Sequence, residues 1–195
     1  MLGRDHRHFD AVSPALVLSN SEVGLGSLAV QTSVWTGGCT NLMVINERST
    51  RKYHVGQRAE LGEEVFKLLT DQTRRLTDAA LWAQIGDICK GAFEQAQFDA
   101  VCDKLEATTK EDIGGDPAAV IELTAEKFQM SNEERGLVLK HLIKGSDLTR
   151  YGLHAAITRT AEDLESYDRA SQFEVLGGKI IELPQNEWQE LALAA

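Results

Sequence analysis

The hydrophobic period of this chain changes once, at about residues 58–60, from a two-residue alternation to a helical repeat. Before that point, residues 27–35 place an apolar side chain at every second position, as a strand with one apolar face does. After it, apolar residues recur at helical spacings up to Gly91. Strands followed by a run of helices predict an α+β fold.

The N-terminal part, residues 1–58, predicts a small antiparallel sheet. Residues 15–18 form a short apolar run that favours a buried strand, and residues 27–35 form the alternating one. Gly37-Gly38 is a turn signal before a further strand at 39–45. Residues 46–50 are polar and predict a connection, and residues 52–55 predict a third pairing strand.

The C-terminal part, residues 59–195, predicts a mainly helical region continuous with the sheet in one domain; the alternative is two separate modules joined near residues 57–60. The segment from 60 to 91 predicts one long helix, or two helices broken near Thr77. Asp116 followed by Pro117 is typical of a helix start. Ser131 followed by Glu134 is a capping-box pattern that starts another helix.

The stretch from 149 to 176 carries the longest apolar stripe and predicts one long helix, closed by Gly177-Gly178. Residues 179–183 then predict a short strand or extended link. A terminal helix is predicted around Trp188. The most buried positions of the stripe are expected to be Leu153, Ile157, Leu164 and Phe173.

Composition excludes several classes of protein. Hydrophobic residues make up 43% and charged residues 26%, which excludes collagen-like and wholly disordered chains. The three cysteines form no C-x-x-C pair, which favours a reducing cytoplasm over a disulfide framework. Residues 1–75 carry a net charge of +1 and residues 76–195 a net charge of −11, which together give −10. The acidic part repels phosphate and could bind a basic partner.

Motifs for catalysis or for a resident cofactor are weak in this sequence. His6-x-His8 could bind a metal if the two residues share a strand face, but the pair lies at the terminus, where disorder is usual. The sequence contains no P-loop and no G-x-S-x-G. We therefore expect no catalytic residue, no metal and no cofactor, and a protein that is not an enzyme.

One basic cluster stands out in the first third of the chain. Positive charge and a stackable ring are the composition of a surface that binds single-stranded nucleic acid. On an alternating strand, Arg51 and Tyr53 would share one face and Lys52 the other; a solvated hairpin edge is the alternative explanation. The cluster comprises Arg48, Arg51, Lys52, Tyr53, His54 and Arg58.

Two short motifs precede or overlap this cluster. The first runs from Leu18 to Gly24 and the second is Cys39-Thr40-Asn41. Together with His54-Val55-Gly56 they resemble the phage/plasmid-like protein family, the domain of unknown function numbered 932. Leu42 stands where that family often has glycine. The motif residues without an assigned role are Ser19, Asn20, Ser21, Glu22, Gly24 and Asn41.

The resemblance extends to Arg150-Tyr151-Gly152-Leu153 at the start of the last helical stretch. It implies a short or N-terminally truncated member, carriage on phages or plasmids, and a bacterial cytoplasm. The function it implies is assistance in DNA metabolism, through binding or annealing of single-stranded DNA. Apart from the resemblance, Asn20 and Glu22 could instead fix a turn by binding backbone amides.

A second hypothesis comes from the acidic part of the chain. Four carboxylates, Glu162, Asp163, Glu165 and Asp168, fall within seven residues. They predict an interaction module that blocks a basic host factor, such as a defence protein. The candidate partners are therefore single-stranded DNA, a host protein and a second copy of the chain, and no membrane partner is expected.

Overall fold

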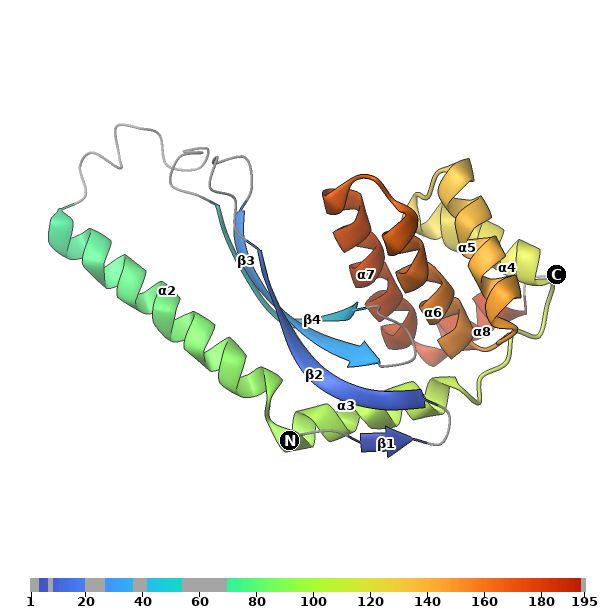
Figure 1. Cartoon of the computed structure of the whole chain (residues 1–195), viewed down its shortest axis with the longest axis horizontal. Helices are drawn as coiled ribbons and strands as arrows, with labels where there is room; N and C mark the ends of the chain where they lie inside the picture. The colour runs from blue at the N-terminus through green and yellow to red at the C-terminus, as the bar shows by residue number, and fades with distance from the viewer. Residues whose placement is uncertain (1–3, 7–8, 20–26, 37–41, 54–69, 194–195) are drawn as a thin grey trace.

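The fold is α+β, as the change of period predicts. The computed structural model describes residues 4–6, 9–19, 27–36, 42–53 and 70–193. Its strands form one antiparallel sheet in the order β1-β2-β3-β4, which curves strongly along its length (Figure 1). The strands are β1 (Arg4–His6), β2 (Phe9–Ser19), β3 (Ser27–Thr36) and β4 (Leu42–Tyr53).

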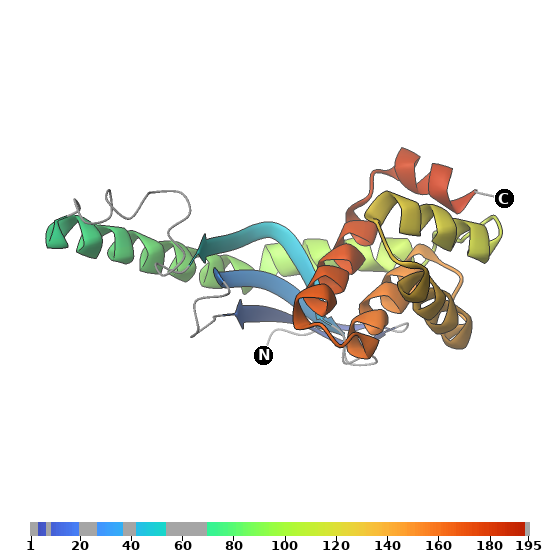
Figure 2. The same cartoon turned by 90° about the horizontal axis from the view of Figure 1, so that it is seen from above.

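Helices follow the sheet in sequence and lie on both sides of it in space. Figure 1 shows α2 and α3 along one side of the curve and the helices from α4 onward gathered at one end. Figure 2 shows α2 and α3 running nearly end to end. Their bounds are α2 (Asp71–Ala92), α3 (Gln95–Thr108), α4 (Pro117–Phe128), α5 (Asn132–Gly145), α6 (Arg150–Thr160), the 3₁₀ turn η1 (Ala161–Asp163), α7 (Tyr167–Glu182) and α8 (Gln185–Ala192).

Strand β4 corrects two predictions. Residues 42–45 and 52–53 do not belong to separate strands, and residues 46–50 are not a connection, because β4 runs from Leu42 to Tyr53. The other residues of these two predictions, 39–41 and 54–55, lie outside the described residues. The register explains the polar interruption: Gln31 pairs with Ser49, but Thr32 pairs with Ile45. The residues between 45 and 49 form a bulge, which lets one strand absorb extra polar residues and bend.

The helix starts follow the predicted caps. Asp116 accepts a hydrogen bond from the amide of Ala118 at 3.0 Å at the start of α4. At the start of α5, Ser131 Oγ accepts from the Glu134 amide at 3.2 Å, and Glu134 Oε2 accepts from the Ser131 amide at 2.7 Å. Helix α2 passes Thr77 without a break, so the segment from 71 to 92 is one helix.

Two clusters of buried side chains form the core. The larger joins α4 to α8 and includes Ile157 and Phe173, which are 0% and 1% exposed. The smaller brings Val12 and Val34 of the sheet against Phe98 and other residues of α3, and against α7. Val12 and Val34 of the sheet therefore share apolar contacts with helical residues more than sixty positions later in the chain.

The predicted single helix at 149–176 is wrong. The chain forms α6, the 3₁₀ turn and α7, and α7 starts where Ser166 Oγ accepts a hydrogen bond from the Arg169 amide. The apolar spacing predicted one helix because it continues across the break: Ala161 stays in the core, and Leu164 packs against that core. Three of the four positions expected to be most buried are so; Leu164 is only half-buried.

Gly177-Gly178 is not a helix cap, and residues 179–182 are helical, because α7 continues to Glu182. Gly177 is required by close packing of α6 on α7. A Cβ at this position would lie 2.2 Å from Thr158 Cγ2 and 3.1 Å from His154 Nδ1. Gly177 therefore serves helix contact, and neither glycine reverses the chain, because both lie within α7.

His154 lies in this contact and should make stability depend on pH. Its Nδ1 donates to the Gly177 carbonyl oxygen at 3.0 Å, and burial lowers its pKa from 6.5 to about 4. Protons therefore bind the unfolded chain more tightly, so this contribution is complete above pH 6.5 and is lost as the pH falls toward 4. We expect a loss of about 3 kcal/mol over that window.

Chemical denaturation at several pH values measures this loss. His154→Gln keeps an N–H donor for the Gly177 carbonyl and does not titrate, so the slope between pH 6.5 and 4.5 should flatten. A slope as steep as in the unaltered chain would show that His154 is not its source.

Candidate nucleic-acid interface

The predicted basic cluster falls on an edge strand. Strand β4 ends the order β1-β2-β3-β4 and pairs only with β3 among the described strands. Arg51 is level with Ala29, Lys52 with Leu28, and Tyr53 with Ser27. Three residues of the cluster thus occupy consecutive positions at the last rungs of the sheet, where the strand leaves it.

The pairing brings two separate sequence motifs to the same place. Ser19, the last residue of β2, pairs with Ala29, and Ala29 pairs with Arg51. These three positions form one row across the sheet. Because the motif that starts at Leu18 continues from the end of β2, its first residues and the basic cluster meet at one end of the sheet. Sequence spacing gave no indication of this proximity.

Alternation divides the cluster between the two faces of the sheet. Arg51 and Tyr53 occupy the face of Ala29, and Lys52 occupies the face of Leu28 and Val30. Arg48 belongs to the bulge between the two registers. His54 and Arg58 lie outside the described residues, as do Asn20, Ser21, Glu22, Gly24 and His8.

Asn41 also lies outside the described residues. In the chain it falls between Thr36, the last residue of β3, and Leu42, the first residue of β4.

Helix α2 adds a basic pair that the sequence analysis did not single out. Its N-terminal end lies on the side of the molecule where β4 ends (Figure 1), and its first turns carry Arg74 and Arg75. Arg75 is exposed. Two adjacent arginines can be recognised in the sequence as a basic pair, but their position relative to β4 depends on the tertiary structure.

The Arg150-Tyr151-Gly152 motif has a structural explanation. Arg150 is 3% exposed, and its guanidinium donates to the carbonyl oxygens of Ile180, Ile181 and Leu183 at 2.8, 2.9 and 2.6 Å. These carbonyls end α7, where helices leave acceptors unpaired. A fourth bond, to Glu111 Oε2 at 2.9 Å, balances the charge. Arg150 therefore fixes the start of α6 to the end of α7.

Gly152 and Tyr151 belong to the same arrangement. A Cβ on Gly152 would lie 1.8 Å from the carbonyl oxygen of Asp147, so only glycine fits there. Tyr151 packs against the cluster that contains Val12, and its ring centroid is 5.7 Å from that of His154. This motif therefore orients helices.

One ion pair and one histidine–aspartate hydrogen bond hold the acidic helical region. Glu134 Oε1 accepts from Arg169 Nε at 2.6 Å, and this guanidinium lowers the pKa of Glu134 to about 2. His141 Nε2 lies 2.7 Å from Asp163 Oδ2, and this hydrogen bond lowers the pKa of Asp163. Both pairs connect α5 to the segment that follows α6, so they replace the expected continuous helix with a fixed turn.

A cavity of about 400 Å³ lies beside the Arg150 motif. Carboxylates and hydroxyls dominate its wall, which does not suit a phosphate group. It is lined by Thr109, Asp112, Ser146, Asp147, Leu148, Thr149 and Tyr151. The cavity is therefore not an extension of the candidate nucleic-acid interface.

Within the described ranges, no group of three or more His, Cys, Asp or Glu side chains is placed to hold a metal ion. No helix in that part of the chain is both long and apolar enough to cross a membrane. The His6-x-His8 pair is only half described, because His6 ends β1 and His8 is not included.

Comparisons with known proteins give no match: no family model, no curated protein and no solved structure is similar to this chain.

Proposed function

We propose that this chain is a non-enzymatic protein of a phage or plasmid that assists DNA metabolism in the host cytoplasm by binding single-stranded DNA. The observation that carries the proposal is the row Ser19, Ala29 and Arg51, in which the family-like motif and the basic cluster meet. The resemblance to the phage/plasmid-like family supports the biological setting, and the basic residues support the ligand.

The edge of the sheet offers the two kinds of contact that bind single-stranded nucleic acid, which are positive charge for phosphates and an aromatic ring for base stacking. Arg51 and Lys52 supply positive charge for phosphates, and Tyr53 supplies a ring for stacking a base. Arg51 and Tyr53 occupy one face of the edge, so a single bound strand can meet a charge and a ring there, while Lys52 occupies the other face. Alternation also lets contacts form on both faces of the edge.

Charge distribution restricts where a nucleic acid can approach. The part from residue 76 onward carries −11, so phosphates are repelled from most of the helical surface. The positive residues of β4 and the start of α2 lie at the end of the molecule away from α4, α5 and α8 (Figure 1). A strand that binds this protein should therefore bind at the sheet end.

Fluorescence anisotropy of a labelled single-stranded oligonucleotide tests the proposal. We expect binding that weakens as salt rises, and Arg48→Ala/Arg51→Ala/Lys52→Ala should reduce the slope of log K against log salt by about 2, at roughly 0.7 per phosphate contact. No binding at low ionic strength would refute the proposal.

A matched variant separates a local contact from a change in net charge. Lys140, Lys144 and Lys179 are exposed on helices of the acidic region. Their joint substitution by Ala removes three positive charges, as the β4 variant does. We expect it to leave the slope nearly unchanged; an equal loss would indicate that net charge, and not the sheet edge, governs binding.

The turn between α6 and α7 favours a second candidate function, binding of a basic host protein. Tyr167 is 67% exposed there and is surrounded in sequence by the exposed acids Glu165 and Asp168. An exposed aromatic beside carboxylates is suited to a cationic partner. Co-purification of a stoichiometric basic protein from host lysate, lost in Tyr167→Ala, would favour this candidate over DNA binding.

A further inference from the structure

The cavity of about 400 Å³ is built by two segments that lie far apart in the chain. Asp112 and Thr149 lie opposite each other in a short antiparallel pairing, with one backbone hydrogen bond of 2.8 Å on either side of them. At such a position the two side chains lie next to each other on one face. The pairing therefore places the Asp112 side chain beside that of Thr149. The two flanking bonds join the Ile113 amide to the Leu148 carbonyl oxygen and the Arg150 amide to the Glu111 carbonyl oxygen.

Asp147 brings a second carboxylate to the same threonine. Thr149 Oγ1 donates to Asp147 Oδ1 at 2.7 Å and accepts from the Gly152 amide at 3.1 Å. The backbone of Gly152 approaches the Asp147 carbonyl so closely that a Cβ would not fit, which fixes the loop in place. Thr149 is thus adjacent to two carboxylates, and all three of these residues line the cavity.

The charge of these two carboxylates is not balanced by the cavity wall. Asp112 and Asp147 are the only charged residues among the seven that line it. The neighbouring Arg150 directs its guanidinium away from them, to the carbonyl oxygens at the end of α7 and to Glu111. Within the described part of the chain, neither aspartate forms an ion pair with a basic side chain. The cavity therefore carries a negative charge that a bound cation would balance.

The size and the remaining wall of the cavity favour an organic cation over a bare metal ion. Its volume lies within the range of sites that hold small organic ligands. Among the described residues, the two aspartates belong to no group of three His, Cys, Asp or Glu side chains that could hold a metal. Tyr151 adds an aromatic ring, which attracts ammonium groups, and Leu148 adds apolar surface for an alkyl chain. The hydroxyls of Thr109 and Ser146 add acceptors for N–H groups.

We propose that this cavity binds a small organic cation with more than one ammonium group, such as a free polyamine. Asp112 and Asp147 accept N–H bonds from the ammonium groups, and these charge-assisted bonds are of the strong class. The alkyl chain between the ammonium groups lies along Leu148 and Tyr151. The proposal uses residues of the helical region alone and does not depend on the proposed binding of DNA by β4.

Isothermal titration calorimetry of the full chain with spermidine at low salt tests the proposal. We expect saturable binding of one spermidine per chain, which weakens as salt rises. Asp112→Asn/Asp147→Asn should reduce the affinity at least about tenfold, because both charged acceptors are lost. Asparagine keeps the size of aspartate and an oxygen that accepts from Thr149, so the fold should be retained, as circular dichroism can check. A chain that binds no spermidine saturably would refute the proposal.

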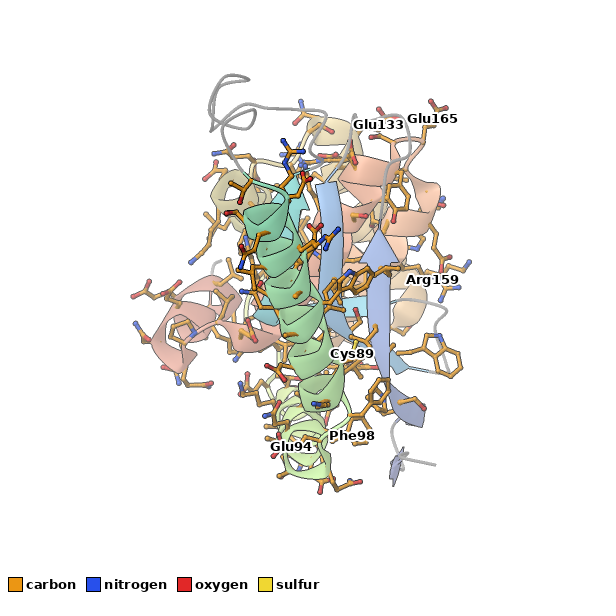
Figure 3. The ribbon with its side chains drawn as sticks, turned by 90° about the vertical axis from the view of Figure 1, so that its left-hand side faces the viewer. Cys89, Glu94, Phe98, Glu133, Arg159 and Glu165 are labelled. Carbon is orange, nitrogen blue, oxygen red and sulfur yellow. The ribbon has the colours of Figure 1, made fainter. Side chains whose placement is uncertain are left out.

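Glu126→Gln/Glu133→Gln is the matched control, because it removes two carboxylate charges outside the cavity. Both residues are exposed, and Glu133 lies in the first turn of α5, at the end of that helix opposite Ser146. Figure 3 shows Glu133 at the outer edge of the molecule. We expect the affinity for spermidine to stay within about twofold of the unaltered chain. A loss equal to that of the aspartate variant would mean that net charge, and not the cavity, attracts the amine.

Two further ligands test the chemical class of the cation. 1-Butylamine carries a single ammonium group and should bind at least about tenfold more weakly than spermidine, because it can satisfy only one of the two carboxylates. Equal affinity would overturn the assignment of a ligand with several charges. Mg²⁺ at the concentration of spermidine should leave spermidine binding in place. If Mg²⁺ displaces spermidine and the aspartate variant no longer binds Mg²⁺, the cavity is a metal site and the proposal is wrong.

Discussion

Replacing Arg150 by Met is expected to lower the free energy of unfolding by about 3–5 kcal/mol, the usual cost of breaking a buried charged network. The substitution keeps the apolar volume of the side chain but removes every donor. Three carbonyl oxygens at the end of α7 then lose their guanidinium donor, and the Glu111 carboxylate loses its bond to that guanidinium. Urea denaturation followed by circular dichroism measures the loss.

Arg150→Lys tests whether charge or donor geometry matters. A lysine ammonium keeps the charge but presents its donors from one atom, so it does not span the carbonyls of Ile180 and Leu183 together with Glu111. We expect it to recover less than half of the lost stability. Glu111→Gln should cost less than either, because it leaves the three carbonyl bonds in place. Unaltered stability in Arg150→Met would show that the network contributes little.

Ile157→Ala is expected to cost about 2–5 kcal/mol, and Ile157→Asp to prevent folding. Ile157 is fully buried in the larger core cluster, between α6 and the helices on either side of it in space. Truncation removes apolar contacts and leaves a cavity, while an aspartate there would be a buried charge without a partner. Thermal and urea melts of the purified chains measure both effects.

Ile143→Ala is the matched control for this site. Ile143 lies on α5 and is 63% exposed, so the same change of side chain removes little buried area. We expect a cost within about 0.5 kcal/mol, as for ordinary surface substitutions. If Ile157→Asp melts like the unaltered chain, the stripe around Ile157 is an exposed docking surface and not core.

The class of fold and most helix starts could be predicted from local signals. The change of period separates sheet from helices, and the caps at Asp116 and Ser131 occupy the expected positions. Caps are local because the side chain and the amides it accepts from lie within three residues of one another. The alternation of residues 27–35 likewise reports directly on β3.

The helix break after Thr160 and the continuity of β4 could not be read in this way. The apolar stripe stays in the core on both sides of η1, so its spacing hides the turn that Ser166 and the Glu134–Arg169 pair fix. In β4 the sequence suggested a break where the strand is continuous, because a bulge accommodates polar residues that resemble a connection. Both outcomes depend on partners distant in sequence.

The features of the candidate site also fall into two groups, those that the sequence determined and those that depend on the tertiary structure. The sequence by itself determined the basic composition of residues 48–58, the family-like motifs and the acidic surplus of the later part. Only the tertiary structure placed Ser19 in one row with Arg51, gave Arg150 its carbonyl partners and separated buried Ile88 of α2 from exposed Leu76 and Trp82. Strand register and helix packing decide which distant residues meet, and neither is encoded in the spacing of neighbouring residues.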